Sequence, residues 1–168
     1  MNSNLKFDFQ VNKENNTVNV IREFNADLNL IWEAWTNPEI LDQWWAPKPY
    51  KNQTKSMDFS EGGQWLYSMT GPKNDTHWCK ADYEKIEVRK QFSYTDNFCD
   101  EHGHTNEKFP NSFWTNVFIQ NPTTTIVNIT IQYKNLEALE KVVEMGFKEG
   151  FAMAFQNLDD YIKLNTKN

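Results

Sequence analysis

The C-terminal part of the chain, residues 136–164, carries the longest helical pattern in the sequence. Most segments before it are strand-like, and a sheet with one apolar face has to be covered by another element. The long helix is the available cover, so the sequence predicts an α+β fold in which a curved antiparallel sheet wraps around a C-terminal helix. A strongly bent sheet also leaves room for a cavity beside the helix. The apolar stripe of that helix is Leu139, Val143, Phe147, Phe151, Ala154, Leu158 and Ile162.

The order of the other segments supports this architecture. Residues 17–24 read as a first strand, and two short helices follow, LNLIWEAWT with Asp27 as its N-cap and PEILDQWW with proline in its first turn. About six strands then alternate with turn residues, as in an antiparallel meander: 55–60, 64–70, 76–88, 91–98, 113–120 and 124–133. No linker or repeat divides the chain, so we expect one domain spanning residues 1–168.

Two glycines lie inside the long helical pattern. Gly146 and Gly150 are four residues apart, and each should cost about 1 kcal/mol relative to alanine. Phe147, Phe151 and Phe155 follow at the same spacing on the neighbouring edge of the helix. The glycine edge of the helix either allows a strand to approach closely or leaves free volume beside the three phenylalanine rings. Ordinary tight packing of the helix on the sheet is the alternative interpretation.

The composition narrows the function. Aromatic residues make up 15% of the chain (7 Trp, 6 Tyr and 12 Phe), although the mean hydropathy is −0.77. Aromatic side chains in excess of core needs can line pockets for apolar ligands. The net charge of −6 and the lack of a basic cluster argue against nucleic acid or an anionic membrane as partner. The two cysteines do not suggest a disulfide scaffold, and no segment resembles a signal peptide or a membrane span, so we expect a cytoplasmic protein without membrane insertion.

Few polar residues qualify as reactive groups. Asp58, before the Gly62-Gly63 turn, and His77, beside Trp78, are the candidate polar groups of a cavity, each with a structural role as the alternative. The polar stretch with Asp100, Glu101, His102 and His104 lacks metal-ligand spacing, so no metal is expected. No phosphate loop, dinucleotide fingerprint or nucleophile motif is present, and no cofactor is expected.

A series of short motifs runs along most of the chain: REF at 22–24, IWEAWT at 31–36, NPE at 37–39, LDQWWAP at 41–47, DFSEGGQW at 58–65, YEKI at 83–86 and MGFKEGF at 145–151, with Leu158 and Tyr161 after them. In these motifs the chain resembles the START-like (SRPBCC) superfamily, whose fold is called helix-grip, and within it the branch of homologues of the activator of the heat-shock-protein-90 ATPase. The family often has glycine where this chain has Ala81, and a histidine and a tryptophan in the segment that here contains Gly146, Phe147 and Phe151. The resemblance implies a ligand-sized cavity between the curved sheet and the C-terminal helix.

The leading hypothesis is binding of a small hydrophobic or aromatic molecule in that cavity. One alternative is a cyclase or dehydratase acting on a polyketide-like or aromatic substrate, with His77 or Asp58 moving protons. Another is an interaction protein that activates a chaperone ATPase, as the branch name suggests. The sequence names no ligand, and it leaves a homodimer open. The expected lining is Trp45, Trp65, Tyr67, Trp78, Tyr94, Trp114, Phe147, Phe151 and Phe155.

Overall fold

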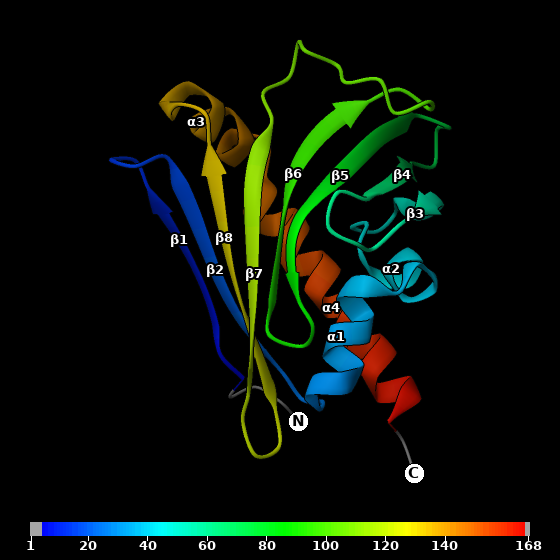
Figure 1. Cartoon of the computed structure of the whole chain (residues 1–168), viewed down its shortest axis with the longest axis vertical. Helices are drawn as coiled ribbons and strands as arrows, with labels where there is room; N and C mark the ends of the chain where they lie inside the picture. Colours follow the sequence, from blue (N-terminus) through cyan, green and yellow to red (C-terminus); the bar gives the residue numbers. More distant parts are fainter. Residues whose placement is uncertain (1–4, 167–168) are drawn as a thin grey trace.

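The computed structural model describes residues 5–166. Its eight strands form one antiparallel sheet in the order β1-β2-β8-β7-β6-β5-β4-β3. Figure 1 shows the N-terminal strands β1 and β2 beside β8 on one side of the sheet, and β3 and β4 on the other. The elements are β1 (Phe7–Asn12), β2 (Thr17–Phe24), α1 (Leu28–Thr36), α2 (Pro38–Trp44), β3 (Lys51–Met57), β4 (Gln64–Thr70), β5 (Thr76–Glu87), β6 (Gln91–Cys99), β7 (Ser112–Gln120), β8 (Thr125–Tyr133), α3 (Leu136–Glu144) and α4 (Phe147–Asn165).

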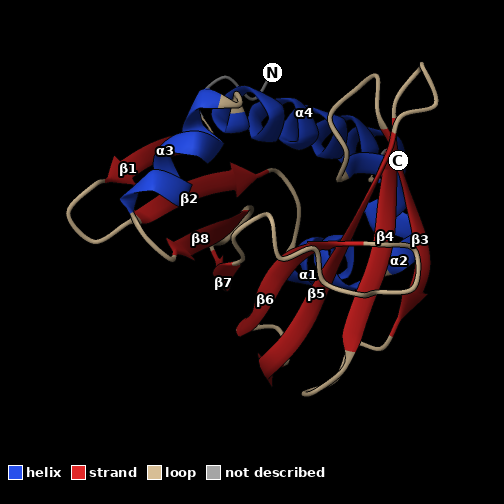
Figure 2. Cartoon of the chain, turned by 90° about the horizontal axis from the view of Figure 1, so that it is seen from above, coloured by secondary structure: helices blue, strands red, loops and turns tan. Residues whose placement is uncertain are grey.

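The sheet curves around its helices. Seen from above, α4 lies across the concave side of the sheet, with α1 and α2 on that same side (Figure 2). Helix α2 contacts β3, and α1 contacts β7. The inward-facing side chains of the strands and the apolar face of α4 share one core, which includes Phe24, Ile129, Phe155 and Leu158. The predicted α+β architecture, a curved antiparallel sheet around a C-terminal helix, is confirmed.

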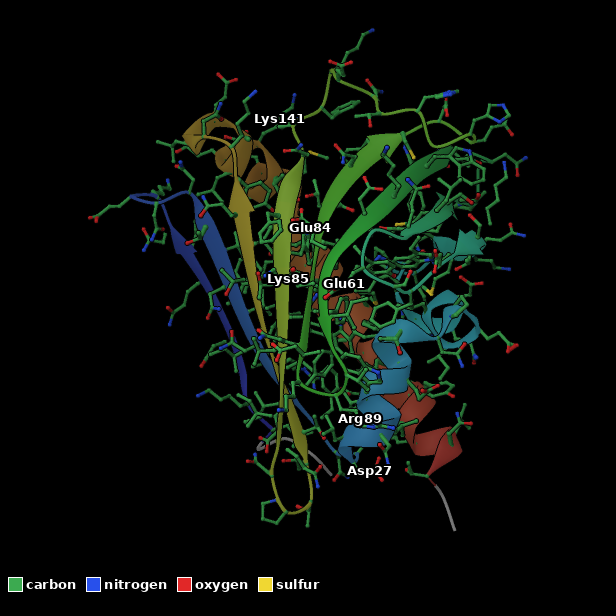
Figure 3. The ribbon with its side chains drawn as sticks, viewed as in Figure 1. Asp27, Glu61, Glu84, Lys85, Arg89 and Lys141 are labelled. Atoms are coloured by element: carbon green, nitrogen blue, oxygen red, sulfur yellow. The ribbon has the colours of Figure 1, made fainter. Side chains whose placement is uncertain are left out.

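Short-range signals in the sequence set the ends of the two short helices. The Asp27 carboxylate accepts a hydrogen bond from the amide of Leu30 at 2.9 Å and caps α1. Asn37 caps α2 in the same way, with its side chain accepting from the amide of Glu39 at 3.0 Å. At the same end of the molecule, Arg89 of the β5–β6 turn donates to Asn29 Oδ1 at 2.8 Å and ties that turn to α1, close to Asp27 (Figure 3).

The C-terminal helical pattern is two helices, which corrects the prediction of a single helix over 136–164. Gly146 adopts φ = 85°, a left-handed conformation that favours glycine, and this residue separates α3 from α4. The period of the apolar residues continues across the break, which is why the pattern alone could not reveal it. Strand β1 is also absent from the prediction, and β3 begins at Lys51 rather than near residue 55.

Among residues 5–166, the helices are all too short or too polar to cross a bilayer. Both cysteines in that range are free.

Candidate functional site

Eight aromatic side chains meet between the inner face of the sheet and α4. The ring of Trp45 lies 5.9 Å from Trp65, 6.1 Å from Trp114 and 6.0 Å from Phe151, measured between centroids. Tyr94 stacks on Trp114 at 5.6 Å. The rings fill this region by contacting one another. We call the set Trp45, Trp65, Tyr67, Tyr94, Trp114, Phe147, Phe151 and Phe155 the aromatic cluster; it contains all but one of the residues predicted to line a cavity.

The local structure explains how these residues meet. Alternate residues of a strand face the same side, which directs Trp65 and Tyr67 of β4 inward together. The four-residue spacing of the phenylalanines places them along one face of α4, with centroids 5.3 Å and 4.4 Å apart. Trp45 follows α2, and its indole Nε1–H donates to the hydroxyl of Tyr67 at 3.3 Å.

Trp78 is the exception among the predicted lining residues. Its neighbours Cys79 and Ala81 are buried on the inner side of β5 in alternation, and Trp78 therefore points to the outer side. There Lys55 Nζ lies 5.7 Å from its ring centroid. Trp78 does not belong to the aromatic cluster.

Neither predicted polar group faces the cluster. Asp58 is exposed at the β3–β4 turn, where its Oδ1 accepts from Ser60. The backbone of Asp58 also lies so close to Gly63 that a Cβ there would come within 2.1 Å of the Asp58 carbonyl oxygen, which explains glycine at this turn. His77 is exposed on β5, 3.4 Å from Asp75, whose other partner is the Tyr50 hydroxyl.

The polar stretch after β6 is a turn built on one carboxylate. Asp100 Oδ1 accepts from the backbone amides of His102 and His104, both at 2.9 Å, and these bonds hold the pKa of Asp100 down at about 2. Across residues 5–166, the His, Cys, Asp and Glu side chains form no group of three or more suited to a metal ion.

Asp96 is a carboxyl group on the inner face of the sheet that the sequence analysis did not select. In the register of the strands, Asp96 lies opposite Ala81 of β5 and Ser112 of β7. Burial, with a smaller contribution from the charge of Asp82, raises the pKa of Asp96 to about 7. The alternation of Phe92, Tyr94 and Asp96 in β6 was the available signal, because it places a carboxyl in line with two core aromatic residues.

Three tyrosines surround this carboxyl. Burial raises the pKa of Tyr67 and Tyr94 well above the ordinary value and that of Tyr133 in the same direction. Their hydroxyls therefore stay neutral and can donate hydrogen bonds. A carboxyl with a pKa near 7 can accept or donate a proton at neutral pH. We call Asp96, Tyr67, Tyr94 and Tyr133, with Cys79 and Ser112, the Asp96 cluster.

Asn116 of β7 is the second inward-facing polar residue that the sequence analysis missed. Its side chain is 0% exposed, and neither amide atom forms a hydrogen bond of normal geometry among the described residues, although the Tyr94 hydroxyl lies close enough to interact with the amide. It lies between Trp114 and Phe118 along the strand and opposite Phe92 and Ile129. An unpaired buried polar group costs about 1–3 kcal/mol, so such a group calls for a partner.

Two of the pockets formed by the described residues lie outside the aromatic cluster. One, of about 570 Å³, is formed by the β1–β2 hairpin, including Gln10 and Glu14. The other, of about 290 Å³, lies between α2, the start of β3 and α4, with Trp44, Pro49 and Asn157 among its lining residues. Asn157 donates to the carbonyls of Trp44 and Ala46 and so ties α4 to the segment that carries Trp45.

The curved sheet, the long helix on its concave side and the aromatic interior between them define a helix-grip protein. Residues 25–163 match the family described as "Activator of Hsp90 ATPase homolog 1-like protein", and the chain belongs to this family. No curated protein matches the sequence.

Several solved structures share the fold. Protein Ms6760 from Mycobacterium smegmatis is 26% identical with a TM-score of 0.85, over 94% of this chain and 96% of that one. A protein from Arthrobacter aurescens is also 26% identical, with a TM-score of 0.84 over 90% and 88% of the two chains. The AHSA1 protein from Silicibacter pomeroyi has 13% identity and a TM-score of 0.69, over 88% and 98% of the two chains.

Proposed function

We propose that this protein binds a small, flat, mostly apolar molecule between the inner face of the sheet and α4. The observation that carries the proposal is the fully buried Asn116, whose amide forms no hydrogen bond of normal geometry, even with the nearby Tyr94 hydroxyl, although it lies in the middle of an aromatic interior. A protein interior built only for stability would favour an apolar residue of similar shape at this place. A bound molecule with a polar atom would supply the missing partner.

Entry requires aromatic rings to move, because the cluster is filled by mutual contact. Phe147 is the member best placed to move: it is half-buried, and it is the first residue of α4, directly after the left-handed Gly146. Its ring contacts Phe9 at 6.1 Å, Trp114 at 6.2 Å and Phe151 at 5.3 Å. A small rotation of this side chain would open the end of the cluster nearest to Trp114.

Native mass spectrometry of protein purified from its own source tests for a ligand that stays bound. Nuclear magnetic resonance tests the location with naphthalene as the probe: the indole N–H signals of Trp45 and Trp114 should shift, while that of Trp78 on the outer face should not. Ala81→Leu should block the shifts because the added side chain faces Trp65 and Asp96, whereas Lys80→Leu, one residue away and pointing outward, should leave them intact. Shifts confined to Trp78, or no shifts at all, would overturn the proposal.

Asp96 favours a second candidate function, proton transfer to or from the bound molecule. Its pKa of about 7 suits a general acid or base at neutral pH, and neutral tyrosine hydroxyls nearby suit a developing oxyanion. Deuterium exchange beside the carbonyl of 2-tetralone, followed by magnetic resonance, tests it. Exchange should be at least tenfold faster with the native protein than with Asp96→Asn; equal rates would remove this candidate.

A further inference from the structure

The neighbours of Asp96 on the inner face are small. Reading across the sheet in register, Trp65 of β4 lies opposite Ala81, Ala81 opposite Asp96, Asp96 opposite Ser112, and Ser112 opposite Tyr133. The carboxyl thus stands between an alanine and a serine, with a tryptophan and a tyrosine at the two ends of the row. The side chains on either side of the carboxyl therefore cover it less than the neighbours of Tyr94 cover that ring. In the next row of the sheet, Tyr94 lies between the large side chains of Tyr83 and Trp114.

The carboxyl has no partner of its own. Within residues 5–166, no side chain or backbone group forms a hydrogen bond or an ion pair with the Asp96 side chain. Two hydroxyls nearby accept hydrogen bonds from indoles, Ser112 Oγ from Trp114 at 2.9 Å and the Tyr67 hydroxyl from Trp45, and neither of them donates to the carboxyl. An unpaired carboxyl in apolar surroundings is costly, and a bound group that donates a hydrogen bond would lower that cost.

Among the residues that the structure describes, no positively charged group contributes to the pKa of Asp96. The titratable groups that interact with it are Asp82 and Cys79 of β5, Tyr67 of β4, Tyr94 and Cys99 of β6, and Tyr133 of β8. Asp82 contacts Lys80 and Gln64 and is itself negative. The environment is therefore negative or neutral, which disfavours a ligand that brings a second carboxylate.

We propose that Asp96 is the specificity-determining residue of the site and selects flat aromatic ligands that present a hydroxyl hydrogen-bond donor, such as a phenol, over ethers and carboxylates of the same shape. This inference rests on the proposed binding function. A hydroxyl satisfies the carboxyl with one short bond and is cheaper to bury than an ammonium group. Tyr94 and Tyr133 can then donate to the ligand oxygen, which has acceptor capacity left.

Three probes of matched shape test this at pH 8, where the Asp96 carboxyl is mostly ionised: 2-naphthol, 2-methoxynaphthalene and 2-naphthoate. The native protein should bind 2-naphthol roughly tenfold or more tightly than 2-methoxynaphthalene, which corresponds to one hydrogen bond to a charged acceptor. Asp96→Leu, similar in size, should reduce this ratio to about twofold or less. Asp96→Asn, which has no charge, should admit 2-naphthoate that the native protein rejects.

Glu84→Gln is the control, since it removes a charge from the adjacent strand at an exposed side chain that accepts from Thr95 and does not contribute to the raised pKa of Asp96. It should leave the 2-naphthol preference unchanged. Binding of 2-naphthol and 2-methoxynaphthalene with equal affinity would overturn the role of Asp96 and leave the proposed function standing. Tighter binding of 2-naphthylmethylamine than of 2-naphthol would also overturn it, in favour of a cationic ligand. If no naphthalene binds at all, the proposed function fails and this inference fails with it.

Discussion

Arg22 of β2 and Asp159 of α4 form an ion pair across the interior of the grip, with Nη2 and Oδ2 2.5 Å apart. Both side chains are largely buried, at 11% and 22% exposure. The guanidinium also lies over the rings of Phe24 at 4.6 Å and Phe155 at 5.6 Å. This contact fastens the C-terminal half of α4 to the sheet. The N-terminal end of the helix, at Phe147, is held by ring contacts. The middle of the helix is tied to the segment after α2 by the hydrogen bonds of Asn157 and by the ring contact of Phe151 with Trp45.

Removing one partner of this pair should destabilise the fold. Asp159→Leu leaves a largely buried guanidinium without its carboxylate, and we expect the free energy of unfolding to fall by about 2 kcal/mol, less than for a fully buried pair. Adding Arg22→Met should restore much of that loss, because the double variant buries neither charge. Urea denaturation of both single variants and the double variant measures the coupling. A single variant within about 0.5 kcal/mol of the native protein would show that the pair contributes nothing measurable.

The two glycines of the C-terminal segment should respond in opposite ways to alanine. Gly146 has φ = 85°, so Gly146→Ala should destabilise the protein by about 1 kcal/mol through backbone strain. Gly150 lies inside α4, and a Cβ there would meet only Pro47 at an ordinary 3.8 Å. Gly150→Ala should therefore stabilise the protein by about 0.5–1 kcal/mol through helix propensity.

Thermal unfolding of the two alanine variants side by side checks this pair. A change of the same sign in both would show that the conformations at these two positions differ from those described. The comparison also separates the two roles of these residues, because the sequence pattern treats Gly146 and Gly150 alike.

Local signals in the sequence predicted most of the elements because the deciding contacts lie within a few residues. Asp27 and Asn37 cap α1 and α2 through amides two or three residues away. The start of α1 was predicted from Asp27 as its N-cap, and that of α2 from the proline in its first turn. The break at Gly146 was missed because the apolar period runs through it and only the backbone angle reveals it. Strand β1 gave no signal, since its residues are mostly exposed and alternate little in burial.

The candidate site was harder to predict because it depends on which face of a strand points inward and on what the other strands place beside it. Strand alternation and helix spacing sufficed for Tyr67 and Phe151, while Trp78 was assigned to the wrong face of β5. Asp96 and Asn116 look unremarkable in the sequence. Their character comes from register, which sets Asp96 against Ala81 and Ser112, and from the lack of partners around Asn116.

Replacing Asn116 with an apolar residue should make the protein more stable and weaken ligand binding. Asn116→Leu keeps the side-chain volume and removes two unpaired polar atoms, so we expect the free energy of unfolding to rise by about 1 kcal/mol and naphthalenes with a polar substituent to bind more weakly. Ser112→Ala is the contrast on the same strand face. Because Ser112 Oγ accepts from Trp114, its loss should destabilise the protein by about 1 kcal/mol. Destabilisation by Asn116→Leu would mean that its amide is paired after all.

The contribution of Asp96 to stability should depend on pH. Its folded-state pKa of about 7 lies above the ordinary value of 3.8, so between these values the folded protein holds a proton that the unfolded chain has released. Stability therefore rises as the pH falls from 8 towards 4, and the cost of burying the charged carboxylate is fully present above pH 7. Asp96→Asn removes that charge and should stabilise the protein at pH 8 by about 2 kcal/mol, less than the full linkage value because the carboxyl is partly exposed.

At pH 5 the same substitution should have a clearly smaller effect, because the native carboxyl is then protonated in the folded state and only the cost of protonating it from the unfolded chain remains. Chemical denaturation of the native protein, Asp96→Asn and the outward-facing control Glu84→Gln at both pH values measures the difference. An equal effect of Asp96→Asn at pH 5 and pH 8 would contradict a raised pKa at this position. A larger effect at pH 5 would mean that the pKa of Asp96 is lowered instead of raised, and that a partner stabilises the charged carboxylate. A larger stabilisation by Asp96→Asn at pH 8 than at pH 5 would show that the unpaired carboxyl lowers the free energy of unfolding at neutral pH. A ligand hydroxyl bound to the carboxyl could offset that loss.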